Sequence, residues 1–263
     1  MSTNVLNPQK FDEKPSAVLF DLDNTLYAYD PAHEAGSLAV RNKVLSKIGI
    51  EADDFDAAFS RARTEIKNQL GETASSHSRL LYFQRTLEHL NLRSQSLLSL
   101  ELEQTYWGSF LAASELREGV GDFLDQLARA DIPRALVTDL TAQIQFRKLV
   151  FMELDRRFEY VVTSEESGHD KPHKAGFELA IAKLKSGSKS ANSNGQEGAV
   201  WMIGDNVTSD IEGAKSAINA TTLALKSEIG DQSSNPAIDM IFDSFTDLER
   251  FVSARGWDRA NNG

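Results

Sequence analysis

The sequence contains no cysteine among its 263 residues, which excludes disulfides, thiolate nucleophiles and zinc–thiolate sites. Basic residues are also in the minority: the formal net charge of −11 disfavours general binding to nucleic acid, which requires a basic surface to neutralise phosphates. No apolar run approaches the length that crosses a bilayer, and the polar residues 1–15 lack the apolar segment of a signal peptide. We therefore expect a cytoplasmic protein that binds neither nucleic acid nor a membrane.

The composition is that of an ordinary globular protein, 41% hydrophobic and 25% charged. The most informative local pattern is the apolar run at residues 17–20, which is typical of a strand buried on both faces of a parallel sheet. The run ends in two acids one residue apart, Asp21 and Asp23. Open α/β sheets bind their ligands at the carboxyl ends of the strands, so both acids are candidate functional residues. One can act as a nucleophile while the other exchanges protons.

Strand and helix patterns alternate from residue 117 onward, as in α/β folds. Strands are predicted at residues 135–137, 160–162, 199–203, 221–225 and 240–242, and helices at 120–130, 142–150, 176–185, 210–217 and 245–255. Residues 186–198 are rich in Ser, Gly and Asn and are predicted to form a surface loop.

The intervening region has a helical pattern. Residues 27–31 are predicted to form a turn, and apolar residues at helical spacing predict helices at 32–47, 54–70, 78–90 and 97–111. We therefore predict a three-layer α/β fold with a Rossmann-like parallel sheet. Residues 1–29 and 115–263 would form this core, and residues 30–114 an inserted all-helical domain.

Further polar groups follow the later predicted strands: Thr138, Lys171, and the acids Asp205 and Asp210. A parallel sheet brings the carboxyl ends of its strands to one edge, so we expect these side chains to converge with the first acids. Together they suit phosphoryl transfer, in which Asp21 attacks phosphorus and a lysine offsets negative charge. Asp21 and Asp205 supply the oxygen ligands that Mg²⁺ prefers.

This arrangement resembles the haloacid dehalogenase superfamily of phosphohydrolases over nearly the whole chain. Residues 21–25, Asp-Leu-Asp-Asn-Thr, are similar to its first motif, Asp-x-Asp-x-Thr. Thr138 fits the second motif and Lys171, which precedes Pro172, fits the third. Residues 204–210, Gly-Asp-Asn-Val-Thr-Ser-Asp, fit the fourth, Gly-Asp-x-x-x-x-Asp. The helical insert is similar to the cap domain of the largest branch of the family.

The resemblance implies a role for each acid. Asp21 would form an aspartyl-phosphate, and Asp23 would protonate the leaving oxygen and then activate water. Asp21, Asp205 and the main-chain carbonyl of Asp23 would bind Mg²⁺, with Asp210 as a further ligand or as the partner of Lys171. Thr138 and Lys171 would hold phosphate oxygens.

Each motif also has a structural alternative when it is taken alone. Two acids after an apolar run are, by themselves, more often a solvated turn or a structural calcium ligand. Ser209 and Glu212 form a capping-box pattern, and Asp210 suits the first turn of a helix. Asp139, which follows Thr138, is expected to turn away from the phosphate and receives no catalytic role. The order of all four motifs around an insert favours the enzymatic interpretation.

The insert has fewer signals. His77, Arg79 and Lys67 are candidates for binding a polar or anionic part of the substrate, because the loop at 71–77 could reach the active site. His33 and Arg41 are weaker candidates. Two sets of residues are interpreted structurally: the aromatic residues Tyr82, Phe83, Tyr106, Trp107 and Phe110 as helix packing, and His169 and His173 as solvent-facing loop residues.

We therefore predict a Mg²⁺-dependent phosphatase of a small phosphorylated metabolite, such as a sugar phosphate or a nucleoside monophosphate. A dehalogenase is disfavoured for two reasons. Dehalogenation needs no metal, and the dehalogenases of the family lack the second acid, which is Asp23 in this sequence. A phosphomutase stays open, as does a phosphonate hydrolase that would use Lys43, Lys47 or Lys67 as a Schiff base. A non-catalytic binding module is the alternative from another class. The sequence leaves the substrate and the choice between monomer and homodimer undecided.

Overall fold

The computed structural model describes residues 3–187 and 198–258. The chain divides into two compact units, which we call the core unit (Met1–Tyr27 with Leu116–Gly263) and the inserted unit (Ala28–Glu115). The predicted loop at 186–198 lies almost wholly outside the described residues. Among those that are described, no helix combines the length and the apolar character required to cross a bilayer.

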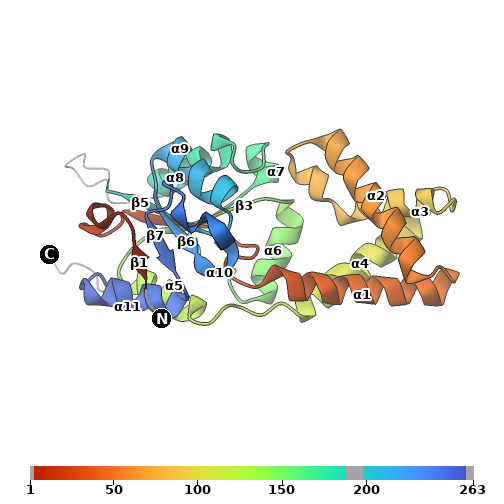
Figure 1. Cartoon of the computed structure of the whole chain (residues 1–263), viewed down its shortest axis with the longest axis horizontal. Helices are drawn as coiled ribbons and strands as arrows, with labels where there is room; N and C mark the ends of the chain where they lie inside the picture. The colour runs from red at the N-terminus through yellow and green to blue at the C-terminus, as the bar shows by residue number, and fades with distance from the viewer. Residues whose placement is uncertain (1–2, 188–197, 259–263) are drawn as a thin grey trace. The chain divides into compact units, whose positions relative to one another are not determined.

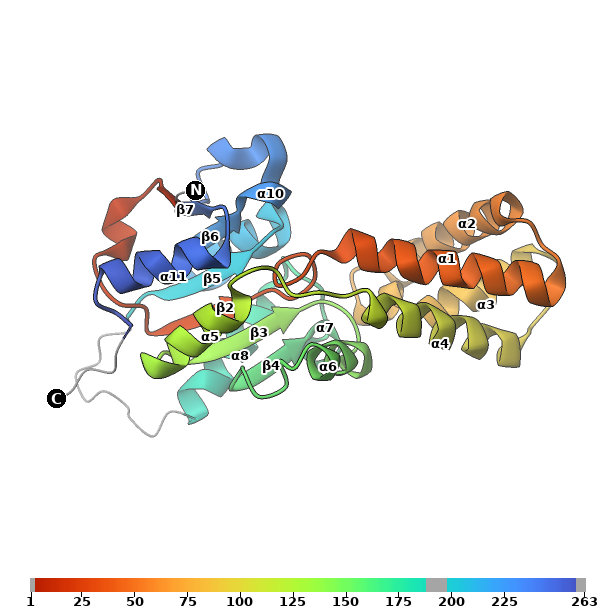
Figure 2. The same ribbon diagram turned by 90° about the horizontal axis from the view of Figure 1, so that it is seen from below.

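The core unit is built on a seven-stranded sheet in the order β1-β7-β6-β5-β2-β3-β4. All neighbouring strands are parallel except β1, which pairs antiparallel with β7 at one edge. The predicted α/β class and parallel sheet are therefore confirmed (Figure 2), whereas the short antiparallel strand β1 was missed. The strands are β1 (Asn4–Val5), β2 (Ala17–Phe20), β3 (Arg134–Thr138), β4 (Tyr160–Thr163), β5 (Val200–Gly204), β6 (Thr221–Leu225) and β7 (Met240–Phe242).

Helices lie on both faces of this sheet (Figure 1). Helices α8 and α9 cover one face, and α5 and α11 cover the other. The helices of the core unit are α5 (Val120–Arg129), α6 (Ala142–Phe151), α7 (Ser164–Ser167), α8 (Lys174–Gly187), α9 (Gly213–Ile218), α10 (Lys226–Ile229) and α11 (Phe245–Ala254). Shorter 3-10 turns occur at Pro8–Phe11 and Gly230–Ser234.

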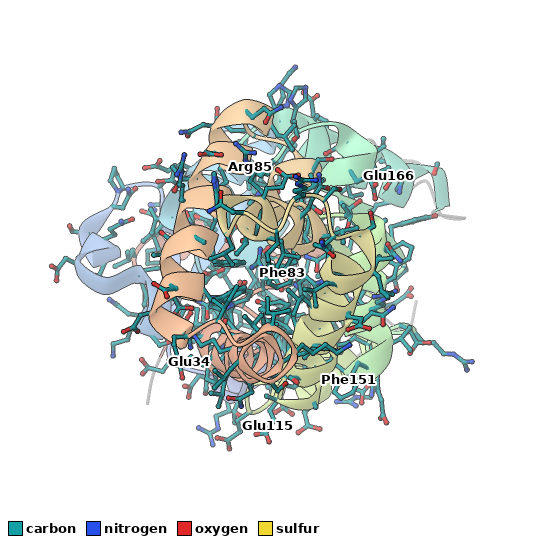
Figure 3. All side chains as sticks on the ribbon, turned by 90° about the vertical axis from the view of Figure 1, so that its right-hand side faces the viewer. Glu34, Phe83, Arg85, Glu115, Phe151 and Glu166 are labelled. Carbon is teal, nitrogen blue, oxygen red and sulfur yellow. The ribbon has the colours of Figure 1, made fainter. Side chains whose placement is uncertain are left out.

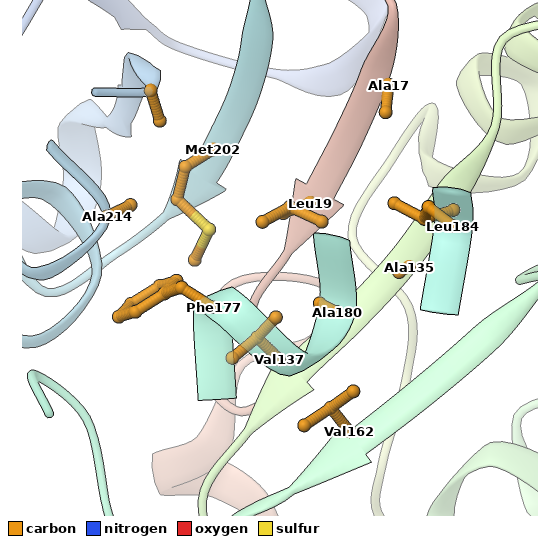
Figure 4. Packing of buried hydrophobic residues seen from close by; sticks show 11 residues of the cluster. Ala17, Leu19, Ala135, Val137, Val162, Phe177, Ala180, Leu184, Met202 and Ala214 are labelled. Carbon is orange, nitrogen blue, oxygen red and sulfur yellow. The ribbon is translucent and has the colours of Figure 1, made fainter. Parts of the chain in front are cut away.

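Strand β2 is central, and its side chains alternate between two apolar layers. Leu19 packs with Val137 and Met202 of the adjacent strands against Phe177 of α8 (Figure 4). On the opposite face, Phe20 packs edge-to-face on Phe123 of α5. Burial on both faces explains why this strand is a continuous apolar run, and it makes the end of β2 a rigid platform.

The inserted unit consists of helices α1 (Tyr29–Ile48), α2 (Ala52–Leu70), α3 (Arg79–His89) and α4 (Ser96–Ala112), with a 3-10 turn at Ala74–His77. Its interior is aromatic: Phe83 is buried and packs against Phe59 and Tyr106. Figure 3 shows Phe83 inside this unit, whereas Glu34 and Arg85 lie on its outside. Packing among the helices accounts for the aromatic stripe in the sequence.

Two local features differ from what the sequence suggested: a predicted turn, and a capping box that was one structural alternative for the fourth motif. The expected turn at 27–31 is shorter, because α1 begins at Tyr29 and accommodates Pro31 in its first turn, where a missing N–H costs nothing. The expected capping box at Ser209 does not form: the segment Val207–Glu212 is a π-helical turn, and its cap is Asn206. The Asn206 side chain accepts hydrogen bonds from the backbone N–H groups of Thr208 and Ser209.

Candidate active site

The carboxyl ends of the three central strands set the position of the site. Phe20, the last residue of β2, pairs with Ile203 of β5 and with Leu136 of β3. The chain that leaves β2 therefore begins beside the chain that leaves β5, and the N–H of Asp21 still donates to the carbonyl of Ile203 at 3.0 Å. Sheet register thus brings the first and fourth motifs together, as the sequence predicted.

Residues of the turn after β2 hold the carboxylates of Asp21 and Asp205 by hydrogen bonds. The hydroxyl of Thr25 lies 3.1 Å from Asp21 Oδ2 and 2.8 Å from Asp205 Oδ1, so it bridges two carboxylates. Asn24 adopts the left-handed conformation with φ of 67°, which Asn tolerates better than most residues. Its amide donates to Asp205 Oδ2 at 3.2 Å and to Glu228 Oε2 at 2.5 Å. Polar residues of the first motif therefore orient the acid of the fourth.

Lys171 joins the third motif to the first and the fourth. Its ammonium is 2.5 Å from Asp21 Oδ1 and 2.7 Å from Asp210 Oδ1, and all three side chains are buried. Its backbone N–H donates to Asp139 Oδ1 at 2.9 Å. Asp139 thus has a positioning contact that sequence reasoning did not foresee.

Gly204 makes room for this arrangement. A Cβ at that position would lie only 2.5 Å from the Cβ of Asp210, so a side chain there would displace the acid. The glycine of the fourth motif is therefore a packing requirement of the site.

Asp23 lies in a separate group of donors. Lys148 Nζ lies 2.6 and 2.8 Å from its two carboxylate oxygens, and Gln145 Nε2 lies 3.1 Å from Oδ2. The hydroxyl of Tyr27 also donates to Oδ1. Gln145 reaches Thr138 as well, donating to Oγ1 at 2.6 Å, so it links the second motif to Asp23. Neither Gln145 nor Lys148 was singled out from the sequence, although their spacing of three residues on a helix was a usable signal.

The pKa values of the two aspartates of the first motif are shifted in opposite directions. Burial raises the pKa of Asp21 well above its usual value, Lys171 opposes this rise, and the acids Asp210 and Asp205 add to it. Burial also raises the pKa of Asp23, but the Lys148 ammonium and its hydrogen bonds outweigh burial and lower the pKa overall. The surroundings of the two neighbouring carboxyls thus shift their pKa values in opposite directions.

The acidic cluster fits a hard divalent cation. Asp21, Asp205 and Asp210 each offer a carboxylate oxygen, and these oxygens lie within 4.8 Å of one another. Burial and the neighbouring Asp210 raise the pKa of Asp205 to about 6. Oxygen-only ligands, negative charge and mutual repulsion all suit Mg²⁺, which takes one or two carboxylates and retains water.

This repulsion predicts how pH affects the stability of the metal-free protein. Asp205 keeps its proton in the folded state up to about pH 6 and in the unfolded state only to its ordinary value of 3.8. Since the folded state binds the extra proton between these values, its stability falls as pH rises through this window, by at most about 3 kcal/mol from this group. Thermal unfolding in chelator should show a lower midpoint at pH 7.5 than at pH 5. Mg²⁺ should raise the midpoint more at pH 7.5, and an equal effect of Mg²⁺ at both values would contradict the assignment.

The candidate substrate-binding residues of the inserted unit differ in their contacts and in their burial. Arg79 donates to the Tyr29 hydroxyl at 2.6 Å and to the His77 carbonyl at 3.2 Å, and its buried Nε has no hydrogen-bond partner among the described residues. Lys67 and His77 are half-buried. Arg41 forms a bidentate ion pair with Asp56.

A pocket of about 210 Å³ within the inserted unit is lined by His33 and Arg41. The ring of His33 lies 2.7 Å from the Tyr106 hydroxyl. In the core unit, the rings of His169 and His173 stack on each other, and both residues are exposed.

The comparisons with known proteins agree with this geometry. A family model for haloacid dehalogenase-like hydrolases matches residues 15–217. The ribulose-1,5-bisphosphate 5-phosphatase of Halopiger xanaduensis is 35% identical over 218 residues, which cover 82% of this chain and 87% of that protein. The glyceraldehyde 3-phosphate phosphatase of Methanopyrus kandleri is 30% identical over 203 residues, which cover 76% of this chain and 80% of that protein.

Fold and site thus define a hydrolase of the phosphatase class. In particular, the chain belongs to the haloacid dehalogenase-like hydrolases. The solved structure of a 2-haloacid dehalogenase from Pseudomonas syringae pv. Tomato DC3000 matches with a TM-score of 0.64 at 18% identity. The match covers 92% of this chain and 100% of that chain. That likeness establishes the fold alone.

Proposed function

We propose that the protein is a Mg²⁺-dependent phosphatase of a small sugar phosphate and that it acts through an aspartyl-phosphate on Asp21. The observation that carries this proposal is the contact between Asp21 and Lys171 at the edge of a three-carboxylate cluster. Two relatives support the substrate class, since both are named for phosphorylated sugars. Nucleoside monophosphates have no such support.

In the first half of the reaction, Asp21 Oδ attacks phosphorus while the bond between phosphorus and the leaving oxygen breaks. Asp23, in the protonated form that the second half of the reaction regenerates, gives a proton to that oxygen, which leaves as an alcohol. Lys171 and the hydroxyl of Thr138 hold the phosphoryl oxygens, and the ammonium offsets the charge of the incoming group. Asp21 and Asp205, with Asp210 close by, would hold Mg²⁺, which would supply positive charge against the anionic substrate.

In the second half, water attacks the same phosphorus and the acyl-phosphate bond to Asp21 breaks. Asp23 is now a carboxylate and accepts the proton from the attacking water. The products are inorganic phosphate and the original Asp21 carboxylate. The chain thus regenerates both acids without an external reactant other than water.

We propose that the inserted unit is a cap domain and that Arg79 binds an anionic part of the substrate, with His77 and Lys67 as neighbouring polar groups. Arg79 lies within 6 Å of the ring centroids of Tyr82, Tyr106 and Trp107, and no carboxylate of the described residues pairs with it. Burial and the positive charges of Arg79 and Arg63 lower the pKa of His33, which indicates a cationic interior. A guanidinium with no counter-charge suits an anion.

Replacing Arg79 with Met should raise KM about tenfold to a hundredfold for sugar phosphates with a second anionic group, because about 1.5–3 kcal/mol of charged hydrogen bonding is lost. Turnover of 4-nitrophenyl phosphate, which has no such group, should change little. Exposed Arg61, which pairs with Glu65 on α2, provides a matched control as Arg61→Met. Equal losses on both substrates would contradict a role in selectivity.

The alternatives have weaker support. A phosphonate hydrolase would need a lysine of the insert as a Schiff base, but Lys43 and Lys47 both form ion pairs with Glu101. A phosphomutase would use the same core residues and would differ in the lifetime of the phosphoenzyme. A non-catalytic module would have no reason to retain the complete set of motifs.

The test is hydrolysis of 4-nitrophenyl phosphate with Mg²⁺, with chelator and with the Asp21→Asn variant, followed by a screen of phosphorylated sugars and nucleotides. We expect activity only with metal and wild-type Asp21, and a preference for sugar phosphates. Activity unaffected by chelator would contradict the metal mechanism. Release of phosphate from a phosphonate, or transfer to a second sugar in place of water, would favour one of the alternatives.

A further inference from the structure

Helix α6 presents two buried polar side chains, Gln145 and Lys148, to the carboxylate of Asp23. Neither belongs to the four motifs. The Lys148 side chain is 1% exposed, and its ammonium reaches both oxygens of Asp23, at 2.6 and 2.8 Å. Since a buried ammonium needs a compensating charge, Lys148 and Asp23 depend on each other.

The site therefore contains two lysines with separate acids. Lys171 lies between Asp21 and Asp210, where phosphorus is attacked, whereas Lys148 pairs with Asp23. The Tyr27 hydroxyl and Gln145 complete the donors to Asp23, so both carboxylate oxygens are engaged and rotation of the group is restricted. Proton transfer in an active site requires this kind of fixed geometry.

Gln145 adds a second connection. The same amide nitrogen that contacts Asp23 also lies 2.6 Å from Thr138 Oγ1 and 2.7 Å from the Asp139 carbonyl. It therefore ties the proposed acid and base to the hydroxyl that holds the phosphoryl oxygen. A shift of α6 would move both groups together.

We propose that Lys148 is a positioning residue for catalysis, which together with Gln145 holds the Asp23 carboxylate in line with the leaving oxygen and, later, with the attacking water. This inference rests on the proposed function and deepens it. Lys148 touches neither substrate nor phosphorus and acts through Asp23. Its removal should therefore impair the two proton transfers and leave the attack of Asp21 itself intact.

Leaving groups of different basicity separate these steps. A 4-nitrophenolate ion departs without a proton, so aspartyl-phosphate formation from its ester does not need Asp23. An alkoxide, as in glycerol phosphate, leaves only with a proton from Asp23. Hydrolysis of the aspartyl-phosphate needs Asp23 with either substrate.

The experiment is pre-steady-state kinetics of Lys148→Met with Mg²⁺ and both substrates. With 4-nitrophenyl phosphate, we expect a rapid burst of one nitrophenol per enzyme followed by slow turnover, and phosphoenzyme should accumulate. With glycerol phosphate, we expect turnover to fall about 100-fold without a burst, at little change in KM. In an Asp23→Asn background, Lys148→Met should cause no additional loss, because its target is gone.

Lys215→Met is the matched control, since Lys215 also pairs with a buried aspartate, Asp239, at 2.8 and 2.9 Å but lies outside the site. Lys215→Met should give no burst, and the ratio of its turnover rates on the two substrates should equal that of wild type. If Lys148→Met does not fold, Gln145→Met can replace it, because this change leaves the ion pair in place. Gln145→Met should also lower the turnover of glycerol phosphate relative to that of 4-nitrophenyl phosphate.

Equal losses on both substrates without a burst, or losses that add fully to those of Asp23→Asn, would overturn the proposal. So would a Gln145→Met variant with the wild-type substrate ratio. These results are distinct from failure of the proposed function, in which the wild-type protein would not hydrolyse either phosphate ester.

Discussion

Replacing Asp21 with Asn should reduce phosphatase turnover by at least about 10⁴-fold, because an amide oxygen cannot form the acyl-phosphate through which the reaction proceeds. The variant should still fold. Asn has nearly the same shape as Asp, so the packing around this buried position is kept. Lys171 retains Asp210 as its counter-charge. The loss is therefore expected in kcat and in the yield of phosphoenzyme.

The measurement combines steady-state rates with thermal unfolding in chelator. Asp231→Asn, which removes an exposed carboxylate from the turn at Gly230–Ser234, provides the matched control and should behave as wild type. Retention of more than a tenth of wild-type turnover by Asp21→Asn would mean that another group is the nucleophile. A large drop in unfolding temperature together with lost activity would point to a structural role.

Replacing Lys171 with Met should have the next largest effect, and it should act on both activity and stability. The ammonium offsets charge on the phosphoryl group, so kcat/KM should fall on the order of 10²–10³-fold. The Lys171 ammonium also lies between two buried carboxylates, 2.5 Å from that of Asp21 and 2.7 Å from that of Asp210. Removing the cation from such a buried group destabilises the metal-free protein by about 3–5 kcal/mol.

Mg²⁺ provides the internal check on this prediction. Because the ion supplies positive charge to the same acids, it should recover more stability in Lys171→Met than in wild type, while activity stays low. Lys174→Met, an exposed lysine at the start of α8, is the control and should change neither property. A variant with normal stability and turnover would contradict the assigned position of Lys171 in the site.

The sequence predicted the core unit well for a physical reason. Its central strands are buried on both faces, so they appear as continuous apolar runs, and the polar groups that follow them mark the strand ends. Parallel pairing then brings Asp21 beside Asp205 without further information. The edge strand β1 was missed because two partly exposed residues carry no apolar run.

The surroundings of Asp23 were not predictable in the same way. Lys148 and Gln145 lie on a helix far along the chain, and a lysine in an amphipathic pattern is normally interpreted as solvent-facing. Only the packing of α6 shows that this lysine is buried against an acid. Asn206 was also missed as the cap of the π-helical turn, because Ser209 and Glu212 match the more familiar capping-box pattern. The specificity residues that we propose for the inserted unit depend on tertiary contacts, which sequence spacing does not show.

The most direct test of the whole account is a crystal structure with Mg²⁺ and beryllium fluoride, which mimics an acyl-phosphate. We predict a beryllium atom bonded to Asp21 Oδ, with fluorides contacting Lys171 and Thr138 and the metal ion coordinated by Asp21 and Asp205. Beryllium bound to Asp23, or a metal ion bound away from the Asp21–Asp205–Asp210 cluster, would contradict the central claim.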